Sequence, residues 1–374
     1  MQSVGAHVAI YQDTLAPPGG LTVADFDTLK QVFDSRLYPI DTAAFGSVSD
    51  IDANSVVIVL MTGVVNSLVS ASLCQSSGFP AGFFYPGDLD PTVSQQFNHG
   101  EIFYTIVADS SGTLSCPHSR TDVKQLAPTS FAHEFQHMIN YVQHVLVRSG
   151  PAEEGWLDEG LSKYAEELAG RSYLTGAVPD QATFNRYTLN DLLDAYHYLA
   201  APGNFVALFP HDDAGSGNNG ACWLFTRYLA DQFGAGITLK LAETASTGAA
   251  NVAAQTGQSF ATLVSRWALA NWVSDLPGFT PAPELRYTSW SFRSTYQSLN
   301  SQYPASFPAP FPLVPTVSAA TAVNVSGTLR SGTGLYHRAL QGPGGTAFSL
   351  LFSTDGSTPL PTAVVPRLTV IRIR

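Results

Sequence analysis

The sequence predicts an α+β protein with a mixed sheet, a helical region and a small β region at the C-terminal end. Three observations support this fold class. Short strand-like apolar runs dominate up to residue 108. A helical period dominates from residue 153 to about residue 272, and short β-like runs with Gly and Pro turns return after residue 317. With 374 residues, of which 45% are apolar, the chain is long enough to build more than one core.

Four strands and one helix are expected in the first part of the chain. The expected helix is Val23–Leu37. The expected strands are His7–Tyr11, Val56–Met61, Gly82–Tyr85 and Glu101–Ala108. Whether one strand lies at a free edge of the sheet, or all are interior strands, stays open because it depends on the strand order.

The next expected helix carries a pattern typical of a metal site. Its apolar residues recur at helical spacing, and Thr129 or Ser130 is expected to cap its start. The apolar stripe consists of Leu126, Phe131, Phe135, Met138, Ile139 and Val142. His133 and His137 are four residues apart, so both imidazoles face one side of the helix and can bind one metal ion. Glu134 lies beside the first histidine, where a base for metal-activated water is needed.

A second helical stretch, from about Glu153 to Leu168, supplies a third candidate ligand. Glu159 lies 22 residues after His137. Zinc held by three protein side chains keeps a fourth position open for water or substrate. The alternative interpretation is that the two histidines only cap or pack an amphipathic helix.

The same stretch also contains candidates to orient a ligand. Glu166 lies two turns after Glu159 on the same helix face. Glu167 and Asp158 compete for this role, and the alternative for all three is a solvated acidic face.

A family resemblance rests on two segments around these residues. They read His133-Glu134-Phe135-Gln136-His137-Met138-Ile139-Asn140 and Trp156-Leu157-Asp158-Glu159-Gly160-Leu161-Ser162. Together they resemble the gluzincin metallopeptidases, and most closely the hyicolysin family of secreted bacterial peptidases. The likeness extends from Phe83–Asp88 to a helix containing Ser259–Ala268, and so covers about the first 300 residues.

The resemblance implies a two-lobed fold with the active-site helix between the lobes, and hydrolysis of peptide bonds. It implies that His133, His137 and Glu159 hold one catalytic zinc ion and that Glu134 is the general base. It also implies that a strand at the edge of the sheet binds the substrate main chain.

In one respect the sequence departs from this resemblance. Gluzincins supply a Tyr or His, just before or within a later helix, that stabilises the oxyanion formed during hydrolysis. The matching region, Gly217–Ala221, contains neither residue type. Nearby candidates are His211, Tyr198 and Tyr228, of which His211 is favoured because it lies beside a Gly-rich stretch.

The expected organisation has four parts. Residues 1–150 form an N-terminal α/β lobe that ends in the active-site helix, and residues 151–300 form a mainly helical lobe with the third ligand. Residues 301–316 form a Pro-rich linker, and residues 317–374 form a small β domain. The last part is either a module for substrate or surface attachment or a covering sheet for the catalytic lobes, and its small size favours the second role.

Cysteine usage leaves the redox state open. Cys74 and Cys116 are either bridged or unpaired thiols, while Cys222 lies in an apolar helical segment and is expected to be a buried thiol.

A second metal is a weaker prediction. Asp50, Asp52 and Asn54 offer oxygen atoms at alternate positions, as Ca²⁺ loops do, but Ser55 and Met61 stand where such loops have Gly and Glu. The alternative is an acidic turn that leads into a strand.

Composition excludes several functions and indicates a location. A net charge of −11 with no cluster of Lys and Arg argues against nucleic acid as a partner. No apolar run approaches the ~18 residues that span a bilayer. Charged residues make up only 13% of the chain, below the usual ~25%, which together with the resemblance indicates a secreted protein. The start of the chain lacks a signal peptide pattern, so a trimmed mature form is expected.

Three functional hypotheses follow, and none specifies an oligomeric state. The first is a zinc-dependent endopeptidase that cleaves protein or peptide substrates. The second is an aminopeptidase with the same chemistry, which needs an acidic group for the substrate's amino terminus. The third is a non-catalytic zinc-containing binding or surface protein, suggested by the missing oxyanion donor.

Overall fold

The computed structural model describes residues 1–209, 215–319, 325–342, 344–345 and 350–373. The chain divides into two compact units, which are described separately. Unit 1 comprises Met1–Asp191 and Ala235–Asn251, and unit 2 comprises Leu192–Gly234 and Val252–Arg374. The domain boundaries expected at residues 150, 300 and 316 stay a prediction.

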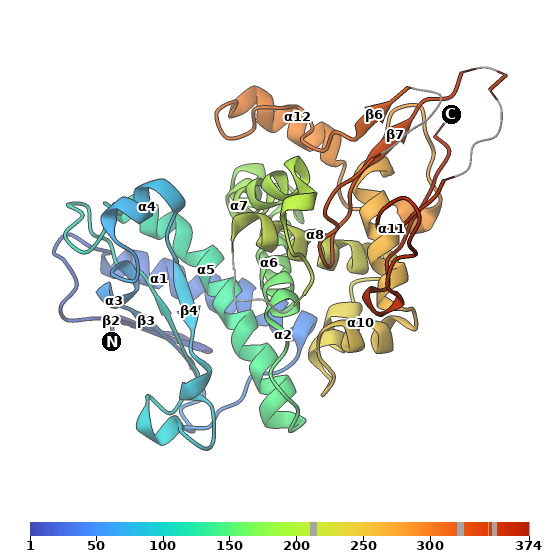
Figure 1. Cartoon of the computed structure of the whole chain (residues 1–374). Helices are drawn as coiled ribbons and strands as arrows, with labels where there is room; N and C mark the ends of the chain where they lie inside the picture. The colour runs from blue at the N-terminus through green and yellow to red at the C-terminus, as the bar shows by residue number, and fades with distance from the viewer. Residues whose placement is uncertain (210–214, 320–324, 343, 346–349, 374) are drawn as a thin grey trace. The chain divides into compact units, whose positions relative to one another are not determined.

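Unit 1 contains a mixed five-stranded sheet with the order β1-β2-β3-β5-β4 (Figure 1). β2, β3 and β5 are parallel, whereas β1 and β4 are antiparallel to their neighbours. The strands are β1 (Ser3–Val4), β2 (Val8–Gln12), β3 (Val57–Met61), β4 (Gly82–Phe84) and β5 (Ile102–Thr105). The sequence prediction of a mixed sheet with helices is confirmed. β5 is shorter than the expected strand Glu101–Ala108. Residues 106–108 are buried but form a connection outside the strand.

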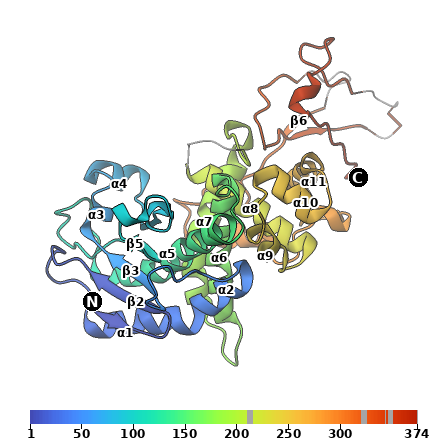
Figure 2. The same ribbon diagram turned by 90° about the horizontal axis from the view of Figure 1, so that it is seen from below.

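Helices surround this sheet. Those of unit 1 are α1 (Val23–Val32), α2 (Tyr38–Phe45), α3 (Gly63–Asn66), α4 (Ala71–Ser77), α5 (Arg120–Tyr141), α6 (Gly155–Arg171) and α9 (Ile237–Ala242). α7 (Gln181–Ala200) and α10 (Gly248–Thr256) begin in unit 1 and end in unit 2. α1 continues as a π-helical turn, Phe33–Leu37, and lies alongside β2 (Figure 2).

An aromatic cluster joins the sheet to α5. Phe33 lies 6.4 Å from Phe103 of β5 and 5.1 Å from Phe135 of α5, measured between ring centroids. Phe103 also packs against Phe131, at 5.6 Å. All four rings are buried. Burial of an aromatic side chain contributes roughly 1.5–3 kcal/mol, so this cluster fixes the apolar face of the histidine-bearing helix on the sheet.

The start of α5 differs from the prediction. The helix begins at Arg120 rather than near Thr129 or Ser130, because Ser119 and Asp122 form a capping box. The sequence pattern around Pro128 resembles a helix start, but the helix continues through this residue. Ser130 consequently lies inside the helix and is buried there.

Unit 2 is mainly helical and has an aromatic core. Its further helices are α8 (Ser216–Phe233), α11 (Phe260–Val273) and α12 (Phe292–Gln302). Trp267 stacks on Tyr198 at 5.6 Å and meets the edge of Phe225 at 5.5 Å. Trp223 and Tyr228 are buried as well.

The C-terminal part of the chain carries less regular structure than expected. Its described strands, β6 (Thr316–Ser318) and β7 (His337–Ala339), form a parallel pair. One of the short β-like runs expected after residue 317, Leu368–Ile373, forms no strand, and Val370 is 63% exposed there. The run Phe348–Phe352 lies partly outside the described residues.

Candidate metal centre

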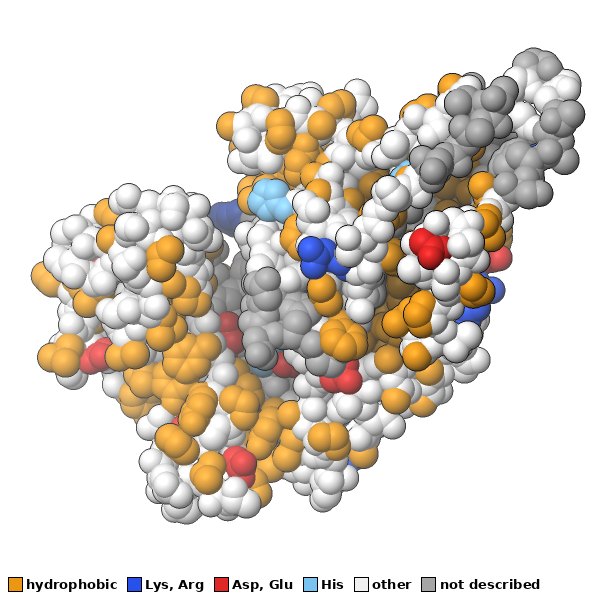
Figure 3. All heavy atoms as spheres, in the orientation of Figure 1, with side chains coloured by type: hydrophobic (Ala, Val, Ile, Leu, Met, Phe, Trp, Pro, Cys, Tyr) orange, Lys and Arg blue, Asp and Glu red, His pale blue; other side chains and the backbone are white. Residues whose placement is uncertain are grey.

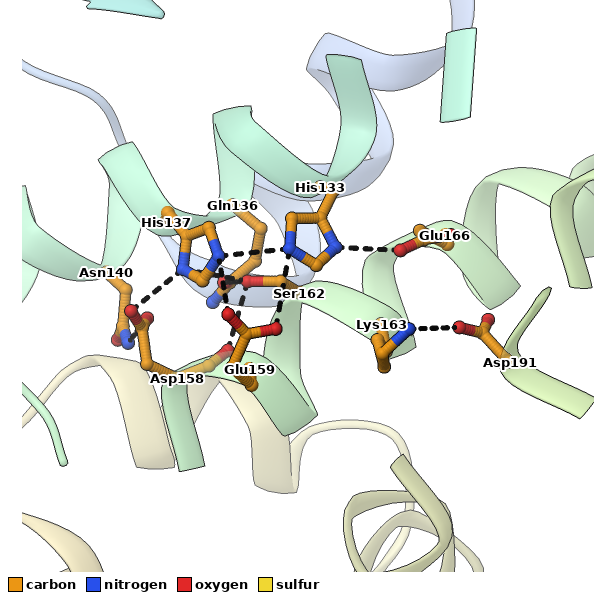
Figure 4. A network of polar contacts seen from close by, with 10 residues as sticks. All are labelled: His133, Gln136, His137, Asn140, Asp158, Glu159, Ser162, Lys163, Glu166 and Asp191. Atoms are coloured by element: carbon orange, nitrogen blue, oxygen red, sulfur yellow. Dashed lines mark hydrogen bonds and ion pairs between the residues drawn. The ribbon is translucent and has the colours of Figure 1, made fainter. Parts of the chain in front are cut away.

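Helices α5 and α6 bring the three predicted ligands together (Figure 4). The Nε2 atoms of His133 and His137 lie 3.1 Å apart. Oε2 of Glu159 lies 3.6 Å from His133 Nε2, and Oε1 lies 3.8 Å from His137 Nε2. The three side chains therefore offer donor atoms around one point, all within 4.8 Å of one another.

The spacing of these donors fits a zinc-sized ion. Tetrahedral zinc with bonds of ~2.0–2.1 Å places neighbouring ligand atoms roughly 3.4 Å apart. The observed separations of 3.1, 3.6 and 3.8 Å bracket this value. Two imidazoles and one carboxylate also match the ligand types that zinc prefers in sites with an open position.

Each histidine is oriented by a carboxylate of α6. His133 Nδ1 lies 2.7 Å from Glu166 Oε1, and His137 Nδ1 lies 2.8 Å from Asp158 Oδ2 (Figure 4). A proton on Nδ1 directed at a carboxylate leaves the Nε2 lone pair for a metal ion. Among the three acidic candidates from the sequence, Glu166 and Asp158 contact histidines, whereas Glu167 pairs with Arg171.

Two polar residues of this network have no signature in the sequence. The Asn140 amide donates a hydrogen bond to Asp158 Oδ1. Ser162 Oγ lies 3.0 Å from His137 Nδ1 and contacts Gln136 Oε1. A single Asn or Ser carries no metal-site pattern. The sequence shows only that Asn140 lies about one helical turn after His137 and that Ser162 lies about one turn after Asp158.

Burial and neighbouring charges shift the pKa values of the site in different directions. Burial lowers the pKa of His133, and His137 adds to this effect. Burial also disfavours charged His137, but the Asp158 carboxylate outweighs it and raises the pKa of His137 to about 10. Burial raises the pKa of Glu134, although the two histidines oppose the shift. A metal ion must therefore compete with a proton for His137.

Glu134 and the three candidate ligands line one cavity of about 310 Å³ in unit 1. Its walls come from β4 and the segment after it, from α5, and from the loop that leads into α6 with the start of that helix. The other lining residues are Gly82, Phe83, Phe84, Pro86, Asn140, Tyr141, Ala152, Glu153 and Asp158. The cavity therefore combines a candidate metal-binding group with an aromatic wall. On the face of the molecule in Figure 3, Lys and Arg side chains are few and scattered.

The strand that borders this cavity, β4, pairs with no described strand on its outer side. β4 is the last strand of the sheet, which answers the question of strand order for this segment. The amide of Ile106 donates to the Ala81 carbonyl, and in the same register Phe83 faces Tyr104. Alternate residues of an antiparallel strand bond to the same neighbour, so the main-chain groups of Gly82 and Phe84 point away from β5.

The positions of the three expected oxyanion donors relative to the candidate metal centre stay a prediction. His211 lies outside the described residues. Tyr198 and Tyr228 belong to unit 2, where their hydroxyls contact Thr333 Oγ1 and the Glu284 carbonyl at 2.9 and 2.8 Å. Tyr141, which the sequence analysis did not single out, lines the cavity in unit 1 and carries a hydroxyl.

Two further groups of potential ligands occur in unit 1. Cys74 and Cys116 form a disulfide with Cα atoms 5.8 Å apart, which rules out the alternative of unpaired thiols. His118 Nε2 lies 3.8 Å from each sulfur. Cys222 is buried in unit 2 and takes no part in this bridge.

The other group contains Asp50, Asp52 and Glu101, of which Glu101 was not identified from the sequence. Ser55 N donates to Asp50 Oδ1, and Asn54 N donates to Asp52 Oδ1. Such contacts favour the predicted alternative of an acidic turn. A Ca²⁺ ion at this place stays a prediction.

Comparison with known proteins gives one informative similarity. No family model matches the chain. The chain is similar to the neutral metalloprotease ShpI of Staphylococcus hyicus, with 26% identity over 205 residues. The match covers 54% of this chain and 40% of that protein, so the chain spans less than half of the length of this relative. The similarity supports a relationship to metallopeptidases and a metal cofactor. In the described residues, none of the helices has the length and apolar character needed to cross a membrane.

Proposed function

We propose that the protein is a zinc-dependent endopeptidase of the gluzincin type, closest to the hyicolysin family. One observation carries the proposal. Two imidazole nitrogens and the Glu159 carboxylate converge on one point, each histidine is oriented by a second carboxylate, and Glu134 lies in the same cavity. The similarity to a neutral metalloprotease supports the same conclusion.

The proposed mechanism assigns a role to each of these residues. His133, His137 and Glu159 would hold zinc, which supplies a water of lowered pKa and polarises the substrate carbonyl. Glu134 accepts a proton from the attacking water and returns it to the leaving amine. Glu166 and Asp158 hold the imidazoles in the required orientation and tautomer.

The free edge of β4 suits an extended peptide. The outward main-chain groups of Gly82 and Phe84 can pair with a substrate strand next to Glu134. Glu153 also lines the cavity, but its carboxylate accepts hydrogen bonds from Gly248 N and Asn251 Nδ2 at 2.6 and 2.7 Å. Its side chain is also only 1% exposed, and this burial together with its existing partners supports an endopeptidase over an aminopeptidase.

We also propose that the protein acts outside the cytosol. The Cys74–Cys116 disulfide is the supporting observation, since such bridges persist mainly in oxidising compartments. Mass spectrometry of protein isolated without reductant from its native source tests this: both cysteines should be oxidised, and detection of two reduced thiols would contradict the location.

Internally quenched peptides with free and acetylated amino termini test the proposed activity. We expect cleavage of both at an internal bond, loss of activity with a chelator, and recovery on addition of Zn²⁺. Cleavage of the free peptide alone would indicate an aminopeptidase. Zinc binding without cleavage of either peptide would indicate the non-catalytic alternative.

A further inference from the structure

At Gly82 the edge strand β4 packs closely against the histidine-bearing helix α5. A Cβ atom added to Gly82 would lie 2.6 Å from Ser130 Oγ and 2.7 Å from the main-chain oxygen of Tyr104. It would also lie 3.1 Å from Glu134 Cγ. Because the Tyr104 oxygen belongs to the backbone of β5, a side chain at position 82 requires β4 to move. The close approach, rather than an unusual backbone angle, therefore explains glycine here.

The contact between β4 and α5 extends beyond Gly82. Ser130 lies one turn before Glu134, and its buried hydroxyl has no hydrogen-bond partner among the described residues, which is consistent with tight packing. Two residues after Gly82, the ring of Phe84 lies 6.0 Å from that of Tyr141, the last residue of α5. The strand thus lies along the helix face that carries Glu134.

This packing fixes the free edge relative to the base. Gly82 directs its own N–H and C=O groups away from β5, and it is the residue of β4 whose added Cβ would touch Glu134. The packing at Gly82 therefore sets the distance between Glu134 and a peptide that pairs with this edge of β4. In enzymes, a misplacement of ~1 Å can cost about 10²-fold in rate.

We propose that Gly82 is a positioning residue for peptide hydrolysis: its missing side chain lets the edge of β4 approach Glu134 and so sets which peptide bond lies opposite the base. This inference rests on the proposed endopeptidase function. It makes Gly82 part of the specificity of the site without direct participation in the chemistry.

Replacement of Gly82 tests the proposal against a matched control. A Cβ added to Gly155, at the start of α6, meets no atom within 4 Å, so Gly155→Ala makes the same chemical change without a clash. For Gly82→Ala we expect kcat/KM on a long quenched peptide to fall on the order of 10²-fold, mainly through kcat, with zinc content unchanged. Mass spectrometry of products should show cleavage shifted or spread to neighbouring bonds. Gly155→Ala should match the wild type.

Several outcomes separate this proposal from a purely structural role and from failure of the proposed function. A Gly82→Ala protein with wild-type kcat and cleavage position would overturn the proposal. Loss of activity only in proportion to lost zinc or lost folded protein would also overturn it. If the wild type cleaves no peptide, the proposed endopeptidase function is wrong. If the wild type cleaves peptides and Gly82→Ala cleaves them equally well at the same bond, only the proposed role of Gly82 is wrong.

A measurement on the native packing covers the case in which Gly82→Ala does not fold. Glu134→Gln protein, which retains Gly82, is titrated with substrate peptides that carry a single N-methyl group at successive positions. We expect affinity to fall about tenfold or more at alternate positions nearest the cleaved bond, because methylation removes the donor to the strand edge. Equal affinity for all methylated peptides would overturn the proposal.

Discussion

Two clusters in unit 1 place three potential metal ligands within 4.8 Å, yet their chemistry differs. The first comprises His133, His137 and Glu159, and the second comprises Asp50, Asp52 and Glu101. In the second cluster, main-chain amides already bind each carboxylate: Asp50 accepts from Ser55, Asp52 from Asn54, and Glu101 from Ile51. The bonds to Asp50 and Asp52 close a turn before β3, and the bond to Glu101 joins this turn to the residue before β5.

In the first cluster, the hydrogen bonds orient the two histidines among the candidate ligands. Carboxylates hold the Nδ1 atoms of His133 and His137, so the Nε2 atoms stay directed at a common point. The comparison shows that clusters with similar distances between side chains can differ in how their donor atoms are oriented. What matters is whether the remaining bonds of each side chain consume its donor atoms or orient them.

Removal of a ligand should have the largest effect. Each of His137→Ala and Glu159→Ala deletes one of three donors, so bound zinc and peptide hydrolysis should both be lost. The measurement is elemental analysis after dialysis against a moderate chelator. Asp52→Ala is the matched control from the second cluster and should keep wild-type zinc. Wild-type zinc in His137→Ala or Glu159→Ala would show that the ligand assignment is wrong.

The orienting carboxylates should have the next largest effect. Asp158→Asn and Glu166→Gln keep side-chain size but remove the charge that polarises each imidazole, so zinc affinity should fall about 10–100-fold. Competition with a chromophoric chelator measures it. Glu243→Gln, which neutralises a carboxylate that is 40% exposed and paired with Arg148, is the control and should not change zinc affinity. Equal affinities for all three variants would remove the distinction between the two clusters.

A smaller effect concerns the pH dependence of the metal-free protein. The pKa of His137 is raised to about 10 by Asp158, against the effect of burial. Since the raised value favours the protonated folded form, the contribution of His137 to stability should be complete below about pH 6.5 and disappear as the pH rises through 10. Asp158→Asn should lower the pKa of His137. Histidine titration by NMR measures both, and a His137 that titrates near 6.5 in the wild type would contradict the account.

The smallest effect is expected at the second cluster. Asp52→Asn changes a residue whose side-chain hydrogen bonds go to Asn54 in the same turn, so it should leave zinc content and peptide turnover unchanged. Zinc content and turnover are measured together with those of the wild type. A loss of either would show that this turn acts on the metal centre through the sheet.

The sequence predicted the features that depend on local spacing. His133 and His137 lie on one helix face, and helical periodicity also identified Glu166 as a candidate to orient a ligand, with Asp158 and Glu167 as competitors. The predicted start of the histidine-bearing helix was wrong. The cap of the histidine-bearing helix was expected at Thr129 or Ser130, whereas Ser119 and Asp122 provide it and α5 begins at Arg120.

Features that depend on contacts between distant segments were not predictable in the same way. β4 precedes β5 in the chain but lies outside it in the sheet, and no residue of Gly82–Phe84 signals an edge by itself. The contact between Gly82 and α5 depends on this strand order. Glu101 similarly joins Asp50 and Asp52 only through the fold.

The variant Glu134→Gln tests the central claim most directly, because it keeps the size of the side chain and removes the base. Purified wild type and variant are compared in zinc content and in cleavage of the same acetylated quenched peptide. The account predicts equal zinc and a turnover lower by about 10²–10⁴-fold in the variant, the range that general base catalysis contributes. Equal zinc with comparable turnover would contradict it.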